Sequence, residues 1–185
     1  GLEAPDVQIH FASGGTLYNN EGKIQAMKDP AITAVVNQSR PESRGSIHIK
    51  SANMVDPPAI SANYLSSPMD QDTLLKGMRI LLKVFQQSDL RPYLKKRLSP
   101  SEDIDVNSDE DLMAYIRNEA STVYHPTSTC SIGKVVDPNL GVMGLEGLSV
   151  IDASVMPYVV SGNTNAATIM LAEKGADLLL AARAS

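Results

Sequence analysis

Hydrophobic and polar positions follow two different periods in the first half of the chain. Three apolar segments of strand length, bounded by Gly, Pro and Ser, come first: residues 7–11, 31–36 and 46–50. They predict an antiparallel sheet, and the alternation around Ile47 and Ile49 predicts that these two side chains face a core. Over residues 74–85 the apolar positions recur every three or four residues, which predicts an amphipathic helix capped by Asp70 or Asp72.

The second half of the chain shows the same contrast. Acidic residues stabilise the first turn of a helix, and their position before an apolar run predicts a helix over residues 109–121. Residues 148–151 predict a short buried strand, and residues 166–182 predict a long helix with Asn165 or Thr164 as its cap. The expected fold class is therefore α+β, with a mostly antiparallel sheet, helices on one face of it, and one long C-terminal helix.

Length and charge exclude several classes of partner. A chain of 185 residues is long enough for one domain, or two small ones, with a hydrophobic core. Its net charge of −5 gives no footprint for nucleic acid, and no stretch has the length of a membrane span. A single cysteine, Cys130, cannot form an internal disulfide, which is compatible with a reducing compartment such as the cytoplasm and does not assign one. We expect no metal site, because His and Cys do not occur at metal-ligand spacing.

Polar side chains that could take part in chemistry gather in the last third of the chain. His125 is a candidate general base, because a neutral imidazole accepts protons near pH 7. Asn163 is a candidate hydrogen-bond donor to the same substrate. Cys130 could instead be a thiol nucleophile paired with His125 in a hydrolase. For each residue a structural role is the alternative, since a histidine or a cysteine in a loop is often only packed there.

A longer motif pattern surrounds these candidates. Its downstream part comprises residues 124–126, 129–130, 133, 136–138, 147–148, 152–157 and 161–165, and its upstream part comprises residues 43–46, 56–57, 63–65, 68 and 70. In order and spacing this pattern resembles the carboxy-terminal half of the glucose–methanol–choline (GMC) flavin oxidoreductases. The resemblance covers most of residues 40–183 and is closest to the choline-dehydrogenase-like branch of that family.

The resemblance implies an FAD-dependent oxidase or dehydrogenase that acts on the CH–OH group of an alcohol. His125 would take the hydroxyl proton while hydride passes to the flavin, and Asn163 would hydrogen-bond the developing alkoxide. Positions next to the cofactor in the family are matched by four residues: Asp152, Ala153, Thr164 and Asn165. The last two stand at a helix start, whose N–H groups suit the electron-rich edge of the flavin ring.

One part of the family pattern does not occur in the sequence. A Gly-x-Gly-x-x-Gly turn for the dinucleotide is absent, and Gly14-Gly15 does not replace it. We therefore expect a carboxy-terminal portion, with residues 1–122 in the substrate-binding domain and residues 123–185 as the return of the FAD-binding domain with the active-site loop. The expected partners are a small alcohol and an amino-terminal FAD-binding chain of the same enzyme, in a split, nicked or truncated protein.

Two other functions are compatible with the same pattern. A lyase on this fold would use His125 as a base to cleave a cyanohydrin, with no hydride transfer. A non-catalytic fragment or binding module would keep the fold and bind no cofactor. Reduction of the flavin by substrate without oxygen separates the oxidoreductase from the lyase, and an absorbance spectrum of the purified protein tests for the cofactor-free module.

Overall fold

The chain folds into two compact units that are each assembled from separate stretches of sequence. The computed structural model describes residues 4–18 and 24–184. The sheet–helix unit comprises residues 6–38 and 68–120, and the histidine unit comprises residues 39–67 and 121–184 together with residues 4–5. The assignment of the chain to a substrate-binding and a cofactor-binding domain stays a prediction.

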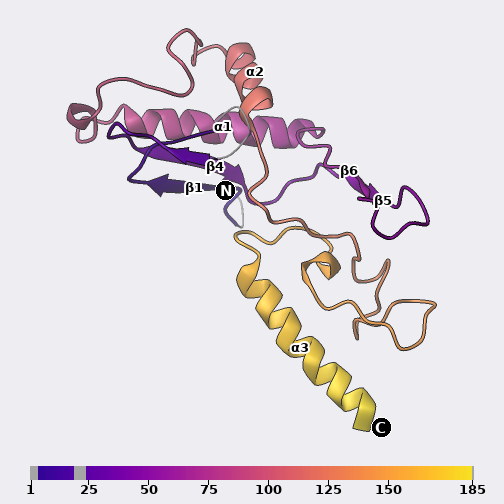
Figure 1. Ribbon diagram of the computed structural model, residues 1–185. Coiled ribbons are helices and arrows are strands. Elements are labelled where there is room, and N and C mark those ends of the chain that lie inside the picture. Colours follow the sequence, from indigo (N-terminus) through magenta and orange to yellow (C-terminus); the bar gives the residue numbers. More distant parts are fainter. Residues whose placement is uncertain (1–3, 19–23, 185) are drawn as a thin grey trace. The chain divides into compact units, whose positions relative to one another are not determined.

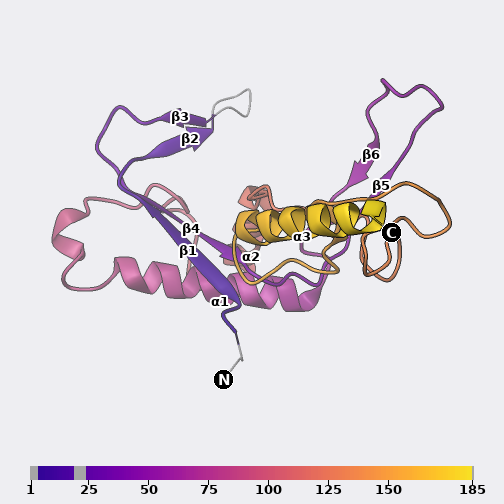
Figure 2. The ribbon, with the colours of Figure 1, turned by 90° about the horizontal axis from the view of Figure 1, so that it is seen from below.

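The sheet–helix unit contains two antiparallel strand pairs. They are β1 (Val7–Ala12) with β4 (Thr33–Gln38), and β2 (Thr16–Tyr18) with β3 (Ile24–Ala26). The helix α1 (Pro68–Phe85) packs along β4 and β1, as Figures 1 and 2 show. It lies close to the sheet at Gly77, where a Cβ atom would lie 2.9 Å from Val36 Cγ2. The glycine therefore allows this helix to lie directly on the sheet.

Helix α1 has the amphipathic character that the sequence predicts for residues 74–85, with Leu81 buried. It begins at Pro68, earlier than predicted, so Asp70 lies inside the first turn rather than at the cap. Proline suits this turn because its missing N–H would have no helical partner there. The Asp70 carboxylate is 1% exposed, and its Oδ1 accepts a hydrogen bond of 2.8 Å from Gln38 Nε2.

A second long helix completes the sheet–helix unit. After the short 3-10 helix η1 (Arg91–Tyr93), α2 (Asp109–Glu119) packs against α1 and buries Leu112 completely. Its start agrees with the prediction, and it ends two residues before the predicted end at residue 121. Ser108 caps it, since the Ser108 Oγ accepts a hydrogen bond of 3.2 Å from Asp111 N.

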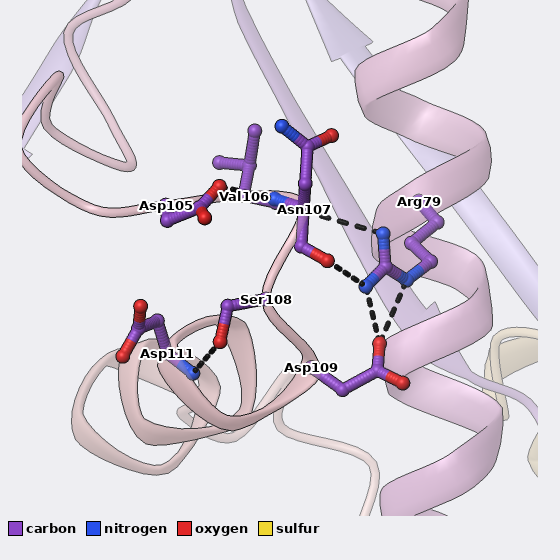
Figure 3. A network of polar contacts seen from close by, with 7 residues as sticks. All are labelled: Arg79, Asp105, Val106, Asn107, Ser108, Asp109 and Asp111. Carbon is purple, nitrogen blue, oxygen red and sulfur yellow. Dashed lines mark hydrogen bonds and ion pairs between the residues drawn. The ribbon is translucent and has the colours of Figure 1, made fainter.

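Arg79 links α1 to the start of α2 (Figure 3). Its Nε donates to Asp109 Oδ1 at 3.0 Å, and a second guanidinium nitrogen pairs with the same oxygen. The guanidinium also donates to the carbonyl oxygens of Val106 and Asn107, at 3.3 and 3.1 Å. Arg79 thus binds the carboxylate of the first residue of α2 and two carbonyl oxygens of the segment before that helix.

The histidine unit contains a third antiparallel pair, β5 (Ser46–His48) with β6 (Ala59–Ser61). Ile47 and Ile49 are 45% and 87% exposed, so the prediction that they face a core is wrong. Alternation identifies which side chains share a face of a strand, but burial requires another element on that face. Every residue of both strands is exposed, so this ribbon buries neither face.

A small apolar cluster forms the core of the histidine unit. Its buried members are Val136, Leu140 and Val155. The 3-10 helix η2 (Ala153–Val155) and the long helix α3 (Asn165–Ala184) both contribute to it, and α3 confirms the predicted C-terminal helix. Helix α3 approaches the cluster closely at Gly175, where a Cβ atom would lie 3.0 Å from Ile151 Cδ1. A glycine at this position therefore fits the packing.

Residues 148–151 are extended, but the prediction of a buried strand there is wrong. Two backbone hydrogen bonds of 2.9 and 3.1 Å link them to residues 140–142 and leave one isolated bridge, between Gly141 and Ser149. A strand needs this pairing to repeat along the chain, and here it does not. Burial is also partial, because Leu148 is 50% exposed.

The predicted α+β class is confirmed by these elements. The described residues contain three α-helices and three antiparallel strand pairs, with the strands paired two by two rather than in one sheet. Within the same residues, each helix is too short or too polar to cross a lipid bilayer.

Candidate active site

His125 lies in an irregular segment whose backbone is restricted on both sides. Tyr124 has a φ of 62°, and its N–H donates to Thr122 Oγ1 at 2.9 Å. Pro126 follows, with φ fixed by its ring. The His125 side chain is half-buried. Since no helix or strand carries the imidazole, its orientation depends on the side chains around it.

Asn163 and Thr164 occupy the tight turn immediately before α3. Gly162 has a φ of 147°, which glycine adopts without strain, and its N–H donates to Val160 O at 2.8 Å. The first hydrogen bond of α3 runs from Thr168 N to Thr164 O, at 2.9 Å. Thr164 is therefore the N-cap residue, and it is 7% exposed, whereas Asn163 is exposed.

These two segments meet at the imidazole of His125. Asn163 Nδ2 lies 2.9 Å from His125 Nε2, and Thr164 Oγ1 lies 3.0 Å from His125 Nδ1. The structure thus brings the two predicted catalytic side chains into direct contact. It also adds a neighbour that sequence reasoning missed, because Thr164 was expected to contribute only its backbone.

A neutral imidazole beside an amide can accept one proton, and the amide can stabilise one developing negative charge. The ring can accept a proton at its unprotonated nitrogen, while the amide offers two N–H groups and no competing base. In the described part of the chain, the side chains of Asn163 and Thr164 are the only hydrogen-bond partners of the ring. No group of three or more His, Cys, Asp or Glu in that part is arranged to hold a metal ion.

The segment after His125 is tied to the segment that leads to Asn163. Cys130 N donates to Ser154 O, and Ile132 N donates to Val155 O, both at 2.9 Å. The Cys130 side chain is a half-buried free thiol. These backbone bonds run between residues 130–132 and η2, so they hold both loops against the apolar cluster.

The residues that the family resemblance assigns to the cofactor lie at the starts of the two helices η2 and α3. Asp152 caps η2, where its Oδ1 accepts a hydrogen bond of 2.7 Å from Ser154 N, and Ala153 is the first residue of η2. Asn165 is the first residue of α3 and is exposed. The N–H groups before the first helical hydrogen bond of α3 suit an electron-rich group. The donor set at Asn165 is therefore compatible with the edge of a flavin ring.

The sequence matches a known family over most of its length. The GMC oxidoreductase family profile matches residues 41–172. An alcohol dehydrogenase [acceptor] of Pseudomonas putida is 40% identical over 182 residues, which are 96% of this chain and 32% of that protein. The human mitochondrial choline dehydrogenase is 38% identical over 185 residues, which are 97% of this chain and 30% of that protein. The chain thus spans about a third of the length of these relatives.

A solved structure agrees with the sequence matches. The crystal structure of pyridoxine 4-oxidase from Mesorbium loti has a TM-score of 0.81 and 26% identity, over 94% of this chain and 34% of the other. The sequence motifs, the fold and the profile match all lead to the same assignment, and the chain belongs to the GMC oxidoreductase family.

Proposed function

We propose that this chain is the portion of an FAD-dependent alcohol oxidoreductase that supplies the proton acceptor and a hydrogen-bond donor to the substrate oxygen. The contact of 2.9 Å between His125 Nε2 and Asn163 Nδ2 is the observation that carries this proposal. It provides a base and a donor at one place, on the side chains whose chemistry the reaction needs.

The first step is the binding of the alcohol at this pair. A single oxygen can lie within about 2.6–3.2 Å of both nitrogens, because the nitrogens themselves are no farther apart than one hydrogen bond. The alcohol then replaces the bond between Asn163 and His125 with two bonds of its own. Its hydroxyl donates to His125 Nε2, and its oxygen accepts from Asn163 Nδ2.

The second step is loss of the hydroxyl proton. His125 accepts this proton at Nε2, and the negative charge that develops on the substrate oxygen is stabilised by the Asn163 N–H. An amide suits this position, since it donates to the oxygen without taking the proton itself. The half-buried position of His125 strengthens these interactions relative to water.

The cofactor of this reaction would be FAD, held by residues at the starts of η2 and α3. We assign the contacts of this chain to Asp152, Ala153, Thr164 and Asn165, the last two through backbone N–H groups at the N-terminus of α3. When bound, FAD supplies the acceptor for hydride from the carbinol carbon. The remainder of the FAD site, and the amino-terminal part that carries it, would come from the rest of the enzyme.

The substrate class is inferred from the relatives. Their names include an alcohol dehydrogenase [acceptor] and oxygen-dependent and mitochondrial choline dehydrogenases. All of these names describe oxidation of a hydroxyl group. We therefore propose small primary alcohols, with choline and unbranched aliphatic alcohols as the first compounds to test.

The proposed function is tested with the complete flavoprotein that contains these residues. We expect the flavin absorbance to bleach when a primary alcohol is added without oxygen, with one aldehyde formed per flavin. A cyanohydrin that is cleaved while the flavin stays oxidised would instead support the lyase. A purified protein that binds no flavin in any preparation would support a non-catalytic module.

A further inference from the structure

Two consecutive residues hold the two nitrogens of the His125 ring. Asn163 contacts Nε2 at 2.9 Å, and Thr164 contacts Nδ1 at 3.0 Å through its hydroxyl. We propose that Thr164 is a positioning residue, whose hydroxyl keeps the imidazole in the tautomer with its proton on Nδ1 and its lone pair on Nε2. This inference rests on the proposed function for its consequence in the reaction, but the tautomer itself can be measured without substrate.

The tautomer follows from counting donors and acceptors around the ring. A neutral imidazole has one N–H donor and one acceptor nitrogen. The amide nitrogen of Asn163 can only donate, so Nε2, its partner, is the acceptor. The ring proton is then on Nδ1 and is donated to Thr164 Oγ1, which has two lone pairs. The other tautomer would place two N–H groups against each other at 2.9 Å.

The position of Thr164 in the fold makes its hydroxyl a fixed acceptor. Its carbonyl accepts the first hydrogen bond of α3, from Thr168 N at 2.9 Å, so its backbone is held by the helix. Its side chain is 7% exposed, which limits competition from water for the same lone pair. A β-branched residue also has few χ1 rotamers. The Nδ1–H of His125 therefore has one acceptor, Thr164 Oγ1, at a fixed position.

This arrangement directs the basic nitrogen of His125, Nε2, toward the proposed position of the substrate oxygen. The Nε2 lone pair faces Asn163, which is where the alcohol oxygen would bind, so the proton moves from the alcohol to Nε2 without a prior change of tautomer. When Nε2 takes that proton, both ring nitrogens become donors. Thr164 Oγ1 still accepts from Nδ1 at that stage, and its bond to a charged donor is stronger than before.

The test compares three variants in the complete flavoprotein. Thr164→Val removes the hydroxyl at nearly constant volume, and Thr164→Ser retains it. Thr168→Val is the matched control: its hydroxyl donates to Thr164 O at 2.9 Å, one helical turn from the site, and does not contact the His125 ring. Flavin content and thermal unfolding of each variant show whether the fold is retained.

Two readouts follow. Nitrogen-15 NMR with labelled histidine identifies which ring nitrogen carries the proton, and comparison with His125→Ala identifies the signals that belong to His125. We expect Nδ1–H in the wild type, Thr164→Ser and Thr168→Val. In Thr164→Val the Nδ1–H has lost its acceptor, so we expect mainly Nε2–H, with the exposed Asn163 amide turned so that its Oδ1 accepts from Nε2. Anaerobic stopped-flow reduction with a primary alcohol should be about 10-fold slower for Thr164→Val at unchanged substrate affinity, and restored within about 3-fold by Thr164→Ser.

Several results would overturn the inference. One is an Nε2–H tautomer in the wild type, and another is an unchanged tautomer in a folded Thr164→Val. Equal slowing by Thr168→Val would point to the start of the helix rather than to the ring. If Thr164→Val does not fold, the wild type and Thr164→Ser still decide through their tautomers. A wild type that no alcohol reduces would refute the proposed function alone, since the NMR result stands without substrate.

Discussion

His125 and Asn163 are separated by 38 positions in the sequence, yet His125 Nε2 lies 2.9 Å from Asn163 Nδ2. The two side chains come from irregular segments, which are held by tight turns and by the apolar cluster beneath them. Because both segments are short and anchored, the contact does not depend on a long flexible loop. We therefore expect the effects of substituting the two residues on the reaction rate to be non-additive.

Replacement of His125 by alanine should remove the proton acceptor. In the complete flavoprotein, we expect the rate constant of flavin reduction by alcohol to fall by at least about 10²-fold, with flavin content unchanged. Anaerobic stopped-flow absorbance measures this rate constant. His48→Ala is the matched control, because His48 is exposed in β5. Near-normal reduction by the His125 variant would refute its assignment as the base.

Replacement of Asn163 by alanine should slow reduction by about 10²-fold, because it deletes one donor to the developing alkoxide. If His125 and Asn163 act on the same oxygen, the double variant should be little slower than His125→Ala alone. Reduction rates of the wild type, both single variants and the double variant form the required cycle. Strictly additive losses would show that the two residues act independently.

Replacement of Cys130 by serine tests the thiol alternative. We expect a reduction rate within about 2-fold of wild type, since a thiolate has no role in the transfer of a hydroxyl proton and a hydride. The Cys130 N–H bond to Ser154 O is a backbone bond and is retained in the variant. A folded Cys130→Ser protein that has lost its activity would revive the nucleophile interpretation.

Substitution of Arg79 should destabilise the protein more than removal of the negative charge of its ion-pair partner, Asp109. Arg79→Met loses the bonds to the Val106 and Asn107 carbonyls as well as the ion pair, and we expect a loss of about 1–2 kcal/mol in the free energy of unfolding. Asp109→Asn keeps an oxygen acceptor for the guanidinium, and Asp109 is largely exposed, so about 0.5 kcal/mol or less is expected.

Denaturant unfolding of the flavoprotein measures these differences. Lys76→Ala is the control. Both side chains of the Lys76–Asp72 ion pair are exposed, so the pair should contribute less than about 0.5 kcal/mol to the free energy of unfolding. An Arg79→Met protein as stable as wild type would mean that the two carbonyls are satisfied equally well by water.

Replacement of Gly175 by alanine should destabilise the histidine unit despite the higher helix propensity of alanine. The propensity gain is about 1 kcal/mol, but the new Cβ would lie 3.0 Å from Ile151 Cδ1 and closer still to its Cγ2. Overpacking of this kind costs about 1–3 kcal/mol, so the expected net loss is about 1 kcal/mol. Thermal unfolding measures it, and Ile151→Ala in the same chain should make the glycine replacement favourable.

Local patterns predicted the helices better than the strands. The spacing of apolar residues over residues 74–85, and the serine and acidic residues around the start of α2, act within one element, so the sequence carries the information directly. Burial of Ile47 and Ile49 depends on whether another element covers the ribbon, and none of their sequence neighbours determines that. The same reason explains residues 148–151, whose pairing ends after one bridge.

The site shows a similar limit. Residue types and the family pattern singled out His125 and Asn163 as candidates, because a base and a donor have distinctive chemistry. The contact between Thr164 Oγ1 and His125 Nδ1 joins residues 39 positions apart and depends on the direction of the Thr164 side chain. A threonine before a helix is fully explained by its cap, so its sequence position gave no signal of a second contact.

The two backbone hydrogen bonds from Cys130 and Ile132 to η2 also have a dynamic consequence. They join the segment after His125 to the segment before Asn163, so a local opening that breaks both would also let the side chains of His125 and Asn163 separate. The amide protons of Cys130 and Ile132 should then exchange with solvent through one opening, with the same opening free energy. Their exchange therefore reports how often the pair comes apart, in the absence of any alcohol.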